Sequence, residues 1–180
     1  MPPARPLITL LTDFGTKDHF VASMKGVILT INPHACIVDI SHDIGPYRVA
    51  EAAYCLRACY RTFPEGTVHV AVVDPGVGSS RRPILVRTSR YYFVAPDNGV
   101  LTPVLAEEQQ VEVRQLENRQ YQLELPGATF HGRDLFAPAA AWLTKGTAST
   151  SFGRLVSDPI RLNRPQPAVM DRNIIGEIVH

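Results

Sequence analysis

The chain has no apolar run near the roughly 20 residues that a bilayer-spanning helix needs. Its first six residues also lack the apolar stretch of a secretory signal peptide. Together these two absences argue against a membrane protein and against a secreted one. They predict a cytoplasmic protein without a membrane partner.

The chain also lacks an excess of charge of either sign. Eighteen Lys and Arg residues stand against 17 Asp and Glu residues, which leaves a formal net charge of +1. A protein that binds a nucleic-acid backbone needs a basic surface, so the composition predicts no nucleic-acid partner. With 45% of its 180 residues hydrophobic, the chain is long enough and apolar enough for one well-packed domain.

Cysteine is scarce, and its placement indicates neither disulfides nor a metal cluster. Cys55 and Cys59 lie four residues apart in a helical pattern, and Cys36 lies in a strand-like run. Such cysteines are typical of small buried apolar residues. The histidines at 34, 42, 69 and 131 do not have the spacing of a zinc site, so we predict no metal ion and keep a catalytic metal as the minor alternative.

Apolar runs of strand length alternate with helical patterns through the first half of the chain. The pattern predicts strands at 7–11, 36–40 and 67–73 and helices at 20–31 and 49–60. Continuously apolar strands joined by crossover helices are typical of a parallel sheet covered on both faces. The sequence therefore predicts an α/β fold.

The second half of the chain predicts antiparallel additions to this sheet. Residues 83–87 and 91–95 have the pattern of a hairpin, and 111–113 with 121–125 have that of a second short antiparallel pair. A helix is predicted at about 135–143, with Asp134 placed to cap its first turn. We therefore expect a mainly parallel but mixed sheet flanked by helices.

The composition changes after residue 156. Residues 157–172 are rich in proline and scattered Arg and Asn, which is typical of a linker. A new strand pattern then begins at residue 173 and stops at residue 180. The sequence predicts an α/β domain at 1–156, a linker at 157–172 and, at 173–180, the first strand of an otherwise missing second domain.

Polar residues follow the predicted strands at their carboxyl ends, which is where open α/β sheets bind ligands. Asp13, Asp43, Asp74 and Asp97 each end a strand, and His131 precedes the last helix. Any single Asp of this kind is most often a turn residue. The set as a whole predicts that these side chains converge on one rim of the sheet.

The stretch 74–82, Asp-Pro-Gly-Val-Gly-Ser-Ser-Arg-Arg, is the most unusual in the chain. A glycine-rich loop directly after a buried strand can bring a carboxylate and a guanidinium together. It lacks the Lys-Ser/Thr pattern of a phosphate loop, and its leading Asp would repel phosphate. From this stretch alone, an equally good interpretation is that Asp74 caps the loop and Arg81 forms a surface ion pair.

Four motifs taken together resemble the S-adenosyl-L-methionine (SAM) hydroxide adenosyltransferase family, which is related to the SAM-dependent fluorinase and chlorinase. They are Leu11-Thr12-Asp13-Phe14-Gly15 with Asp18, Val72-Val73-Asp74-Pro75-Gly76-Val77-Gly78 with Arg81-Arg82, Ala95-Pro96-Asp97-Asn98-Gly99, and Phe130-His131-Gly132-Arg133-Asp134. The match extends over residues 7–145. It implies an N-terminal α/β domain, a C-terminal β-barrel domain, a homotrimer and active sites between subunits.

The resemblance also implies a role for individual residues. Asp74, Arg81 and His131 match the family's water-binding group, whereas Asp13 would bind the ribose hydroxyls and Asp18 the methionine ammonium. Tyr47 would pack against the sugar. The absent barrel would supply the adenine contacts and the group that binds the methionine carboxylate, so the 180-residue form is expected to be nearly inactive.

The activity implied is hydrolysis of SAM to adenosine and L-methionine, with no cofactor. The related halogenases place Tyr where this chain has Asp74 and His131, which favours water over halide as the nucleophile. Phe14, Tyr47 and Phe130 could form dry walls around the reacting atoms, although ordinary core packing explains Phe14 and Phe130 as well.

Two other functions stay open from the residues alone. A metal-dependent phosphatase or nucleotidase would use Asp13 and Asp43 as metal ligands at strand ends. The second is a non-catalytic module that binds a nucleoside and needs no metal ligands. The missing barrel makes this alternative more credible.

Overall fold

A computed structural model describes residues 6–123, 129–163, 168–170 and 173–176. Its centre is a six-stranded sheet with the order β2-β1-β3-β5-β4-β6. The strands are β1 (Leu7–Thr12), β2 (Cys36–Ser41), β3 (Val68–Val72), β4 (Pro83–Arg87), β5 (Tyr92–Pro96) and β6 (Glu112–Gln115). The first four in spatial order run parallel, whereas β4 and β6 pair antiparallel. The prediction of a mainly parallel, mixed α/β sheet is confirmed.

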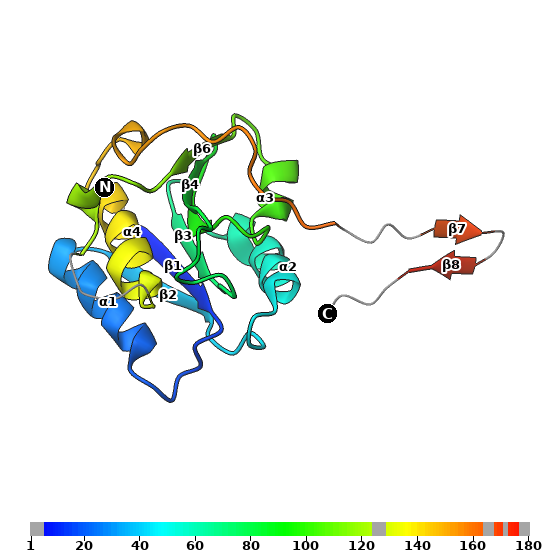
Figure 1. Ribbon diagram of the computed structural model, residues 1–180, viewed down its shortest axis with the longest axis horizontal. Coiled ribbons are helices and arrows are strands. Elements are labelled where there is room, and N and C mark those ends of the chain that lie inside the picture. The colour runs from blue at the N-terminus through cyan, green and yellow to red at the C-terminus, as the bar shows by residue number, and fades with distance from the viewer. Residues whose placement is uncertain (1–5, 124–128, 164–167, 171–172, 177–180) are drawn as a thin grey trace.

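Helices cover both faces of the sheet (Figure 1). On one face, α1 (Phe20–Ile31) packs against α4 (Ala137–Thr144). The other face carries α2 (Val49–Cys59) and the short α3 (Thr102–Glu107), which also contact each other. The long helices and the early strands begin and end within about two residues of their predicted limits, as expected for strongly periodic segments.

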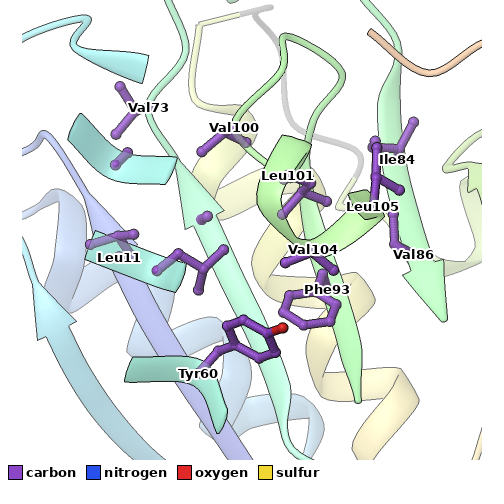
Figure 2. Close-up of a cluster of buried hydrophobic side chains, with 14 of the residues drawn as sticks. Leu11, Tyr60, Val73, Ile84, Val86, Phe93, Val100, Leu101, Val104 and Leu105 are labelled. Atoms are coloured by element: carbon purple, nitrogen blue, oxygen red, sulfur yellow. The ribbon is translucent and has the colours of Figure 1, made fainter. Parts of the chain in front are cut away.

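The apolar side chains form two cores, because successive residues of a strand point to opposite faces. In β1, Leu11 joins the core beneath α2 and α3, and Leu10 joins the core beneath α1 and α4. Figure 2 shows the first core, where Tyr60 and Phe93 pack with Val104 of α3. Each large side chain fully buried in this way contributes about 1.5–3 kcal/mol to folding.

The order in which the chain visits the strands creates a crevice beside β1. From β1 the chain passes through α1 to β2 on one side, and then through α2 to β3 on the other side of β1. Because β2 and β3 flank β1 on opposite sides, the order of the strands reverses at β1. Open α/β sheets bind ligands at such a switch point, outside the carboxyl ends of the strands.

Two local predictions are wrong. The predicted pairing of 111–113 with 121–125 does not form, because β6 pairs with β4 and Tyr121 lies in the 3₁₀ turn η2 (Arg119–Tyr121), against Trp142. Residues 124–125 lie outside the described residues. The last helix is preceded by a π-helical turn, η3 (Gly132–Phe136), and Asp134 lies inside this turn, where it pairs with Arg133 and does not act as an N-cap.

The segment predicted as a linker begins with residues that contact the domain. The amide of Ile160 donates to Asp97 Oδ1 at 2.8 Å, and the amide of Leu162 donates to Thr102 Oγ1 at 2.8 Å. Farther on, β7 (Ala168–Met170) and β8 (Asn173–Ile175) form a separate antiparallel pair (Figure 1). Within the described ranges, no helix combines the length and apolar character that crossing a bilayer requires.

His69 is a buried polar residue in the middle of β3. Its side chain is fully buried, and Nδ1 lies 2.8 Å from Thr9 Oγ1 on β1. The aromatic rings of Tyr60, Tyr91 and Phe93 surround it. Burial lowers the pKa of His69 to about 3, so the imidazole is neutral in the folded protein at neutral pH.

This pKa shift predicts a loss of stability in mild acid. The unfolded chain takes up a proton on His69 as the pH falls below its ordinary pKa, whereas the folded chain resists protonation until about pH 3. Between about pH 7.5 and 5.0 the free energy of unfolding should therefore fall by about 2 kcal/mol through this group alone. Urea unfolding at pH 7.5 and 5.0 measures this loss. The double variant Thr9→Val/His69→Leu should lack the part of the loss that comes from His69. Equal losses in both proteins would contradict the assignment.

Candidate active site

A pocket of about 370 Å³ opens at the carboxyl ends of β1 and β3, a size suited to a small ligand. Its walls come from the loop after β1, the loop between β2 and α2, the loop after β3, and the approach to η3. These four segments are far apart in sequence. The pocket lies at the switch point of the sheet, on the rim formed by the carboxyl ends of the strands.

Asp13 stands at the head of the loop after β1 and lines the pocket. Its Oδ2 accepts a hydrogen bond from the backbone N–H of Tyr47 at 2.8 Å. Tyr47 has a φ of 63°, which is uncommon for a non-glycine residue, and its side chain also lines the pocket. Backbone strain of this kind persists where surrounding contacts hold it, and here the contact is the Asp13 carboxylate.

Asp74 and Arg81 form a buried pair across the glycine-rich loop after β3. The Nε of Arg81 donates to both carboxylate oxygens of Asp74, at 3.0 and 2.8 Å, and Nη2 donates to Oδ2 as well. The two side chains are 5% and 8% exposed, so the interpretation of Arg81 as a surface ion-pair partner is wrong. Asp74 does also cap its own loop, because the amide of Gly76 donates to Oδ1 at 3.2 Å.

His131 is the third member of this cluster. Its Nδ1 lies 2.7 Å from Arg81 Nη2, and since the guanidinium can only donate, Nδ1 accepts and the imidazole proton lies on Nε2. Burial lowers the pKa of His131, and the charge of Arg81 lowers it further, against the opposing effects of Asp74 and Asp134. His131 is therefore a neutral base near physiological pH.

The three residues differ in their access to the pocket. Asp74 and His131 line it, whereas Arg81 lies behind them and binds both. The Arg81 guanidinium also lies 5.2 Å from the centre of the Phe136 ring. Because Nδ1 accepts from Arg81 and Nε2 carries the proton, the neutral imidazole can orient a small polar molecule as a donor. The Asp74 carboxylate beside it can accept the proton of that molecule.

Glycine at position 132 allows His131 to reach this place. A Cβ atom at Gly132 would meet the Phe14 ring at 3.1 Å and the Met24 sulfur at 3.2 Å. The π-helical turn that begins here can therefore pack directly on α1 and on the Phe14 wall of the pocket. Such turns are frequent at functional sites.

Three acidic residues that the sequence singled out do not line the pocket. Asp18 and Asp43 are exposed and outside its lining. Asp97 is buried, but its carboxylate binds Arg82 Nε at 2.9 Å and the amide of Ile160. The structure thus brings together Asp13, Tyr47, Asp74 and His131 around one cavity and turns the remaining acids elsewhere.

An aromatic wall forms much of the rest of the lining. Phe20 stacks on Phe130 with ring centres 5.8 Å apart, and Phe14 contacts Phe20 edge-on at 6.0 Å. Phe14 also packs against the core, but Phe130 is 39% exposed, so core packing does not explain it. From the sequence, Phe20 is predicted only to begin the helix at 20–31. Its position at the start of the first helix after a strand-end Asp is the signal that could have indicated it.

In the part of the chain that the structure describes, no three His, Cys, Asp or Glu side chains are arranged to hold a metal ion.

Comparison with known proteins gives a single family. Residues 8–153 match the family model described as the SAM hydroxide adenosyltransferase N-terminal domain. A relative from Methanocaldococcus jannaschii named (R)-S-adenosyl-L-methionine hydrolase is 37% identical over 178 residues. The alignment covers 96% of this chain and 65% of that protein, so the chain spans about two thirds of its relative's length.

Two further matches are a relative with an enzyme name and a solved structure. A protein from an Actinoplanes species named Fluorinase is 29% identical over 199 residues, covering 97% of this chain and 67% of that one. The crystal structure of an uncharacterized conserved protein from Thermotoga maritima superposes with a TM-score of 0.92 at 43% identity, over 96% of this chain and 66% of the other.

The contact between Arg81 and His131 predicts how the His131 imidazole responds to substitution. Arg81→Met removes the charge that lowers the pKa of His131 and leaves the opposing effect of Asp74, so this pKa should rise. Arg81→Lys keeps the charge and should leave the pKa below its ordinary value. Titration followed by NMR of the imidazole protons measures both variants. An unchanged pKa in the Met variant would show that Arg81 does not act on His131.

Proposed function

The chain belongs to the SAM hydroxide adenosyltransferase family, and from this membership and the geometry of its pocket we propose that it hydrolyses SAM to adenosine and L-methionine. The observation that carries the proposal is the buried cluster in which Arg81 holds Asp74 and His131 at the pocket wall. Two carboxylate oxygens and a neutral imidazole suit a water nucleophile.

The reaction requires little beyond a correctly placed water. The water oxygen forms a bond to the ribose 5′ carbon while the carbon–sulfur bond breaks, and the electron pair leaves on sulfur as the neutral thioether of methionine. Because sulfonium is already a good leaving group, no general acid is needed. The proton of the water passes to the Asp74 carboxylate and then to solvent, because Nδ1 of His131 is occupied by Arg81 and its Nε2 already carries a proton.

Positioning and desolvation supply the catalytic advantage. Fixing a water in line with the breaking bond can contribute several kcal/mol, on the order of 7–11 in the best intramolecular cases. Asp74 and His131 orient this water, and the charge of Arg81 favours its hydroxide character. The wall of Phe14, Phe20 and Phe130 keeps other water away from the cationic substrate.

The pocket lining supports two of the three proposed substrate-binding roles. Asp13 would bind the ribose hydroxyls and Tyr47 would pack against the sugar, and both line the cavity. Asp18 would bind the methionine ammonium. It lies in the same loop as Asp13 but outside the lining, so its role rests on the family motif alone.

Water is favoured over halide as the nucleophile, although some relatives are named Fluorinase. Halogenases have Tyr at the positions of Asp74 and His131, and a buried anion at Asp74 would repel a halide ion. A phosphatase would need Asp13 and Asp43 to share one site. Asp43 is exposed and outside the pocket, so the structure does not support that alternative.

We further propose a cytoplasmic homotrimer whose α/β domain at 1–156 is followed by a linker at 157–172 and a β-barrel that begins at 173–180. No cofactor is required, since SAM is the substrate. The greater length of the relatives supports an additional domain. The exposure of Tyr47 and Phe130, at 68% and 39%, supports closure of the pocket by a second subunit.

The products distinguish this proposal from its alternatives. The whole protein incubated with SAM and EDTA should release adenosine and methionine in equal amounts, measured by chromatography. S-adenosylhomocysteine or methylthioadenosine would indicate another reaction. Loss of activity with EDTA would favour a metal-dependent enzyme, and tight adenosine binding without turnover would favour a non-catalytic module.

The water-positioning cluster predicts a non-additive pair of substitutions. Arg81→Lys keeps the charge but loses the planar fork, so turnover should fall at least about tenfold, or about 1.4 kcal/mol. His131→Ala should also lower turnover, and the double variant should lose less than the sum of the single effects. SAM affinity should change less than turnover. Additive losses, or a loss confined to binding, would show that these residues do not act on one water.

A further inference from the structure

Thr12 and His42 form a buried hydrogen bond directly behind the pocket. Thr12 is the last residue of β1 and His42 follows β2, and their exposed fractions are 0% and 5%. Thr12 Oγ1 lies 2.8 Å from His42 Nδ1. Neither side chain lines the pocket, and neither has a role in the reaction described above.

An irregularity in the sheet brings the two residues together. Leu10 of β1 is paired with Asp39 of β2, but Leu11 is paired with Ser41, so β2 contains one extra residue at this point. With regular pairing, Thr12 would lie opposite Ser41. The bulge moves His42 opposite Thr12 instead, and bulges of this kind commonly re-aim a side chain beside a functional site.

The polar neighbours of His42 bear on which group donates in the Thr12–His42 hydrogen bond. His42 Nε2 lies 3.1 Å from Asp39 Oδ1, although the two groups are not aligned as a hydrogen bond, and Lys25 donates to Asp39 Oδ2 at 2.6 Å. Burial by itself would raise the pKa of Asp39, but the interactions with Lys25 and His42 outweigh it and lower this pKa. A carboxylate at this distance favours a proton on Nε2, and in that tautomer Nδ1 accepts from the Thr12 hydroxyl.

The Thr12 hydroxyl then holds the loop that carries Asp13. With its proton directed at His42, Oγ1 accepts the backbone N–H of Phe14 at 3.3 Å. The carbonyl of His42 accepts the N–H of Gly15 at 2.7 Å. Asp13 is thus attached on one side by its own carboxylate to Tyr47, and on the other by two hydrogen bonds to the Thr12–His42 pair.

We propose that Thr12 and His42 are positioning residues that set Asp13 and Phe14 in the geometry required to bind the sugar of the substrate. The inference rests on the proposed role of Asp13 in binding the ribose. Without this pair the loop is free to move its carboxylate, and a displacement of about 1 Å in a positioning group is costly. The hydrogen bonds of the water-handling cluster come from other loops and do not include Thr12 or His42, so we expect the loss to fall on substrate binding.

The chain offers a matched control on the same strand. Thr9 and His69 form the same type of bond, Oγ1 to Nδ1 at 2.8 Å, and Thr9 is also fully buried, but this pair is remote from the pocket lining. Thr12→Val and Thr9→Val therefore remove the same chemical group from equally buried positions. Thr12→Ser keeps the hydroxyl and serves as the conservative variant.

The first measurement is amide exchange by NMR, which requires no substrate. In Thr12→Val the amides of Phe14 and Gly15 should exchange at least about tenfold faster than in the wild type, whereas Thr9→Val and Thr12→Ser should leave them within about twofold. Equal protection of these amides in Thr12→Val and Thr9→Val would overturn the proposal, whether or not the protein hydrolyses SAM.

The second measurement separates KM from kcat for SAM hydrolysis in the whole protein. Thr12→Val should raise KM at least about fivefold with kcat within about twofold, because uniform binding is lost, whereas Thr9→Val should change neither. His42→Asn keeps an acceptor near the Nδ1 position and should raise KM less than His42→Gln does. A fall in kcat alone, or equal effects of Thr12→Val and Thr9→Val on KM, would overturn the inference. A wild type that releases no adenosine would instead refute the proposed function and leave the amide-exchange result standing.

Discussion

The burial of the Asp74 carboxylate is the constraint on which the site depends. An ionised carboxyl removed from water is costly unless it is paired and hydrogen-bonded. Arg81 meets this requirement with a two-pronged contact that only a tight loop permits, and Gly78 within that loop has a φ of 78°. The same guanidinium then fixes the imidazole of His131, so one buried ion pair determines the positions of both pocket-facing groups.

The pocket has two halves, each with its own hydrogen bonds, which meet where Phe14 packs against Gly132. One half consists of the loop after β3 and the π-helical turn η3, joined through Arg81. The other half consists of the loops after β1 and β2, which are joined by hydrogen bonds between Asp13 and Tyr47 and between Thr12 and His42. Because each half has its own fixed contacts, nucleophile handling and substrate binding can be perturbed separately.

Much of the fold could be predicted from periodicity. The alternation of apolar strands and helices from 7 to 73 is strong, and the structure confirms those elements and the hairpin of β4 with β5. Prediction failed at Tyr121, where the apolar pattern resembled a strand. Tyr121 is instead held in a turn by contacts with Trp142 and Phe152, residues more than 20 positions away that local patterns do not report.

The sequence by itself determined the family, the α/β class and the strand-end position of the site, because motifs and periodicity are local. Only the tertiary structure decided which polar residues meet. Asp74 and Asp97 both follow buried strands, yet Asp74 faces the pocket with Arg81, whereas Asp97 turns to Arg82 and Ile160. A carboxylate takes the donors that the folded chain brings within about 3 Å, and such donors can come from distant parts of the sequence.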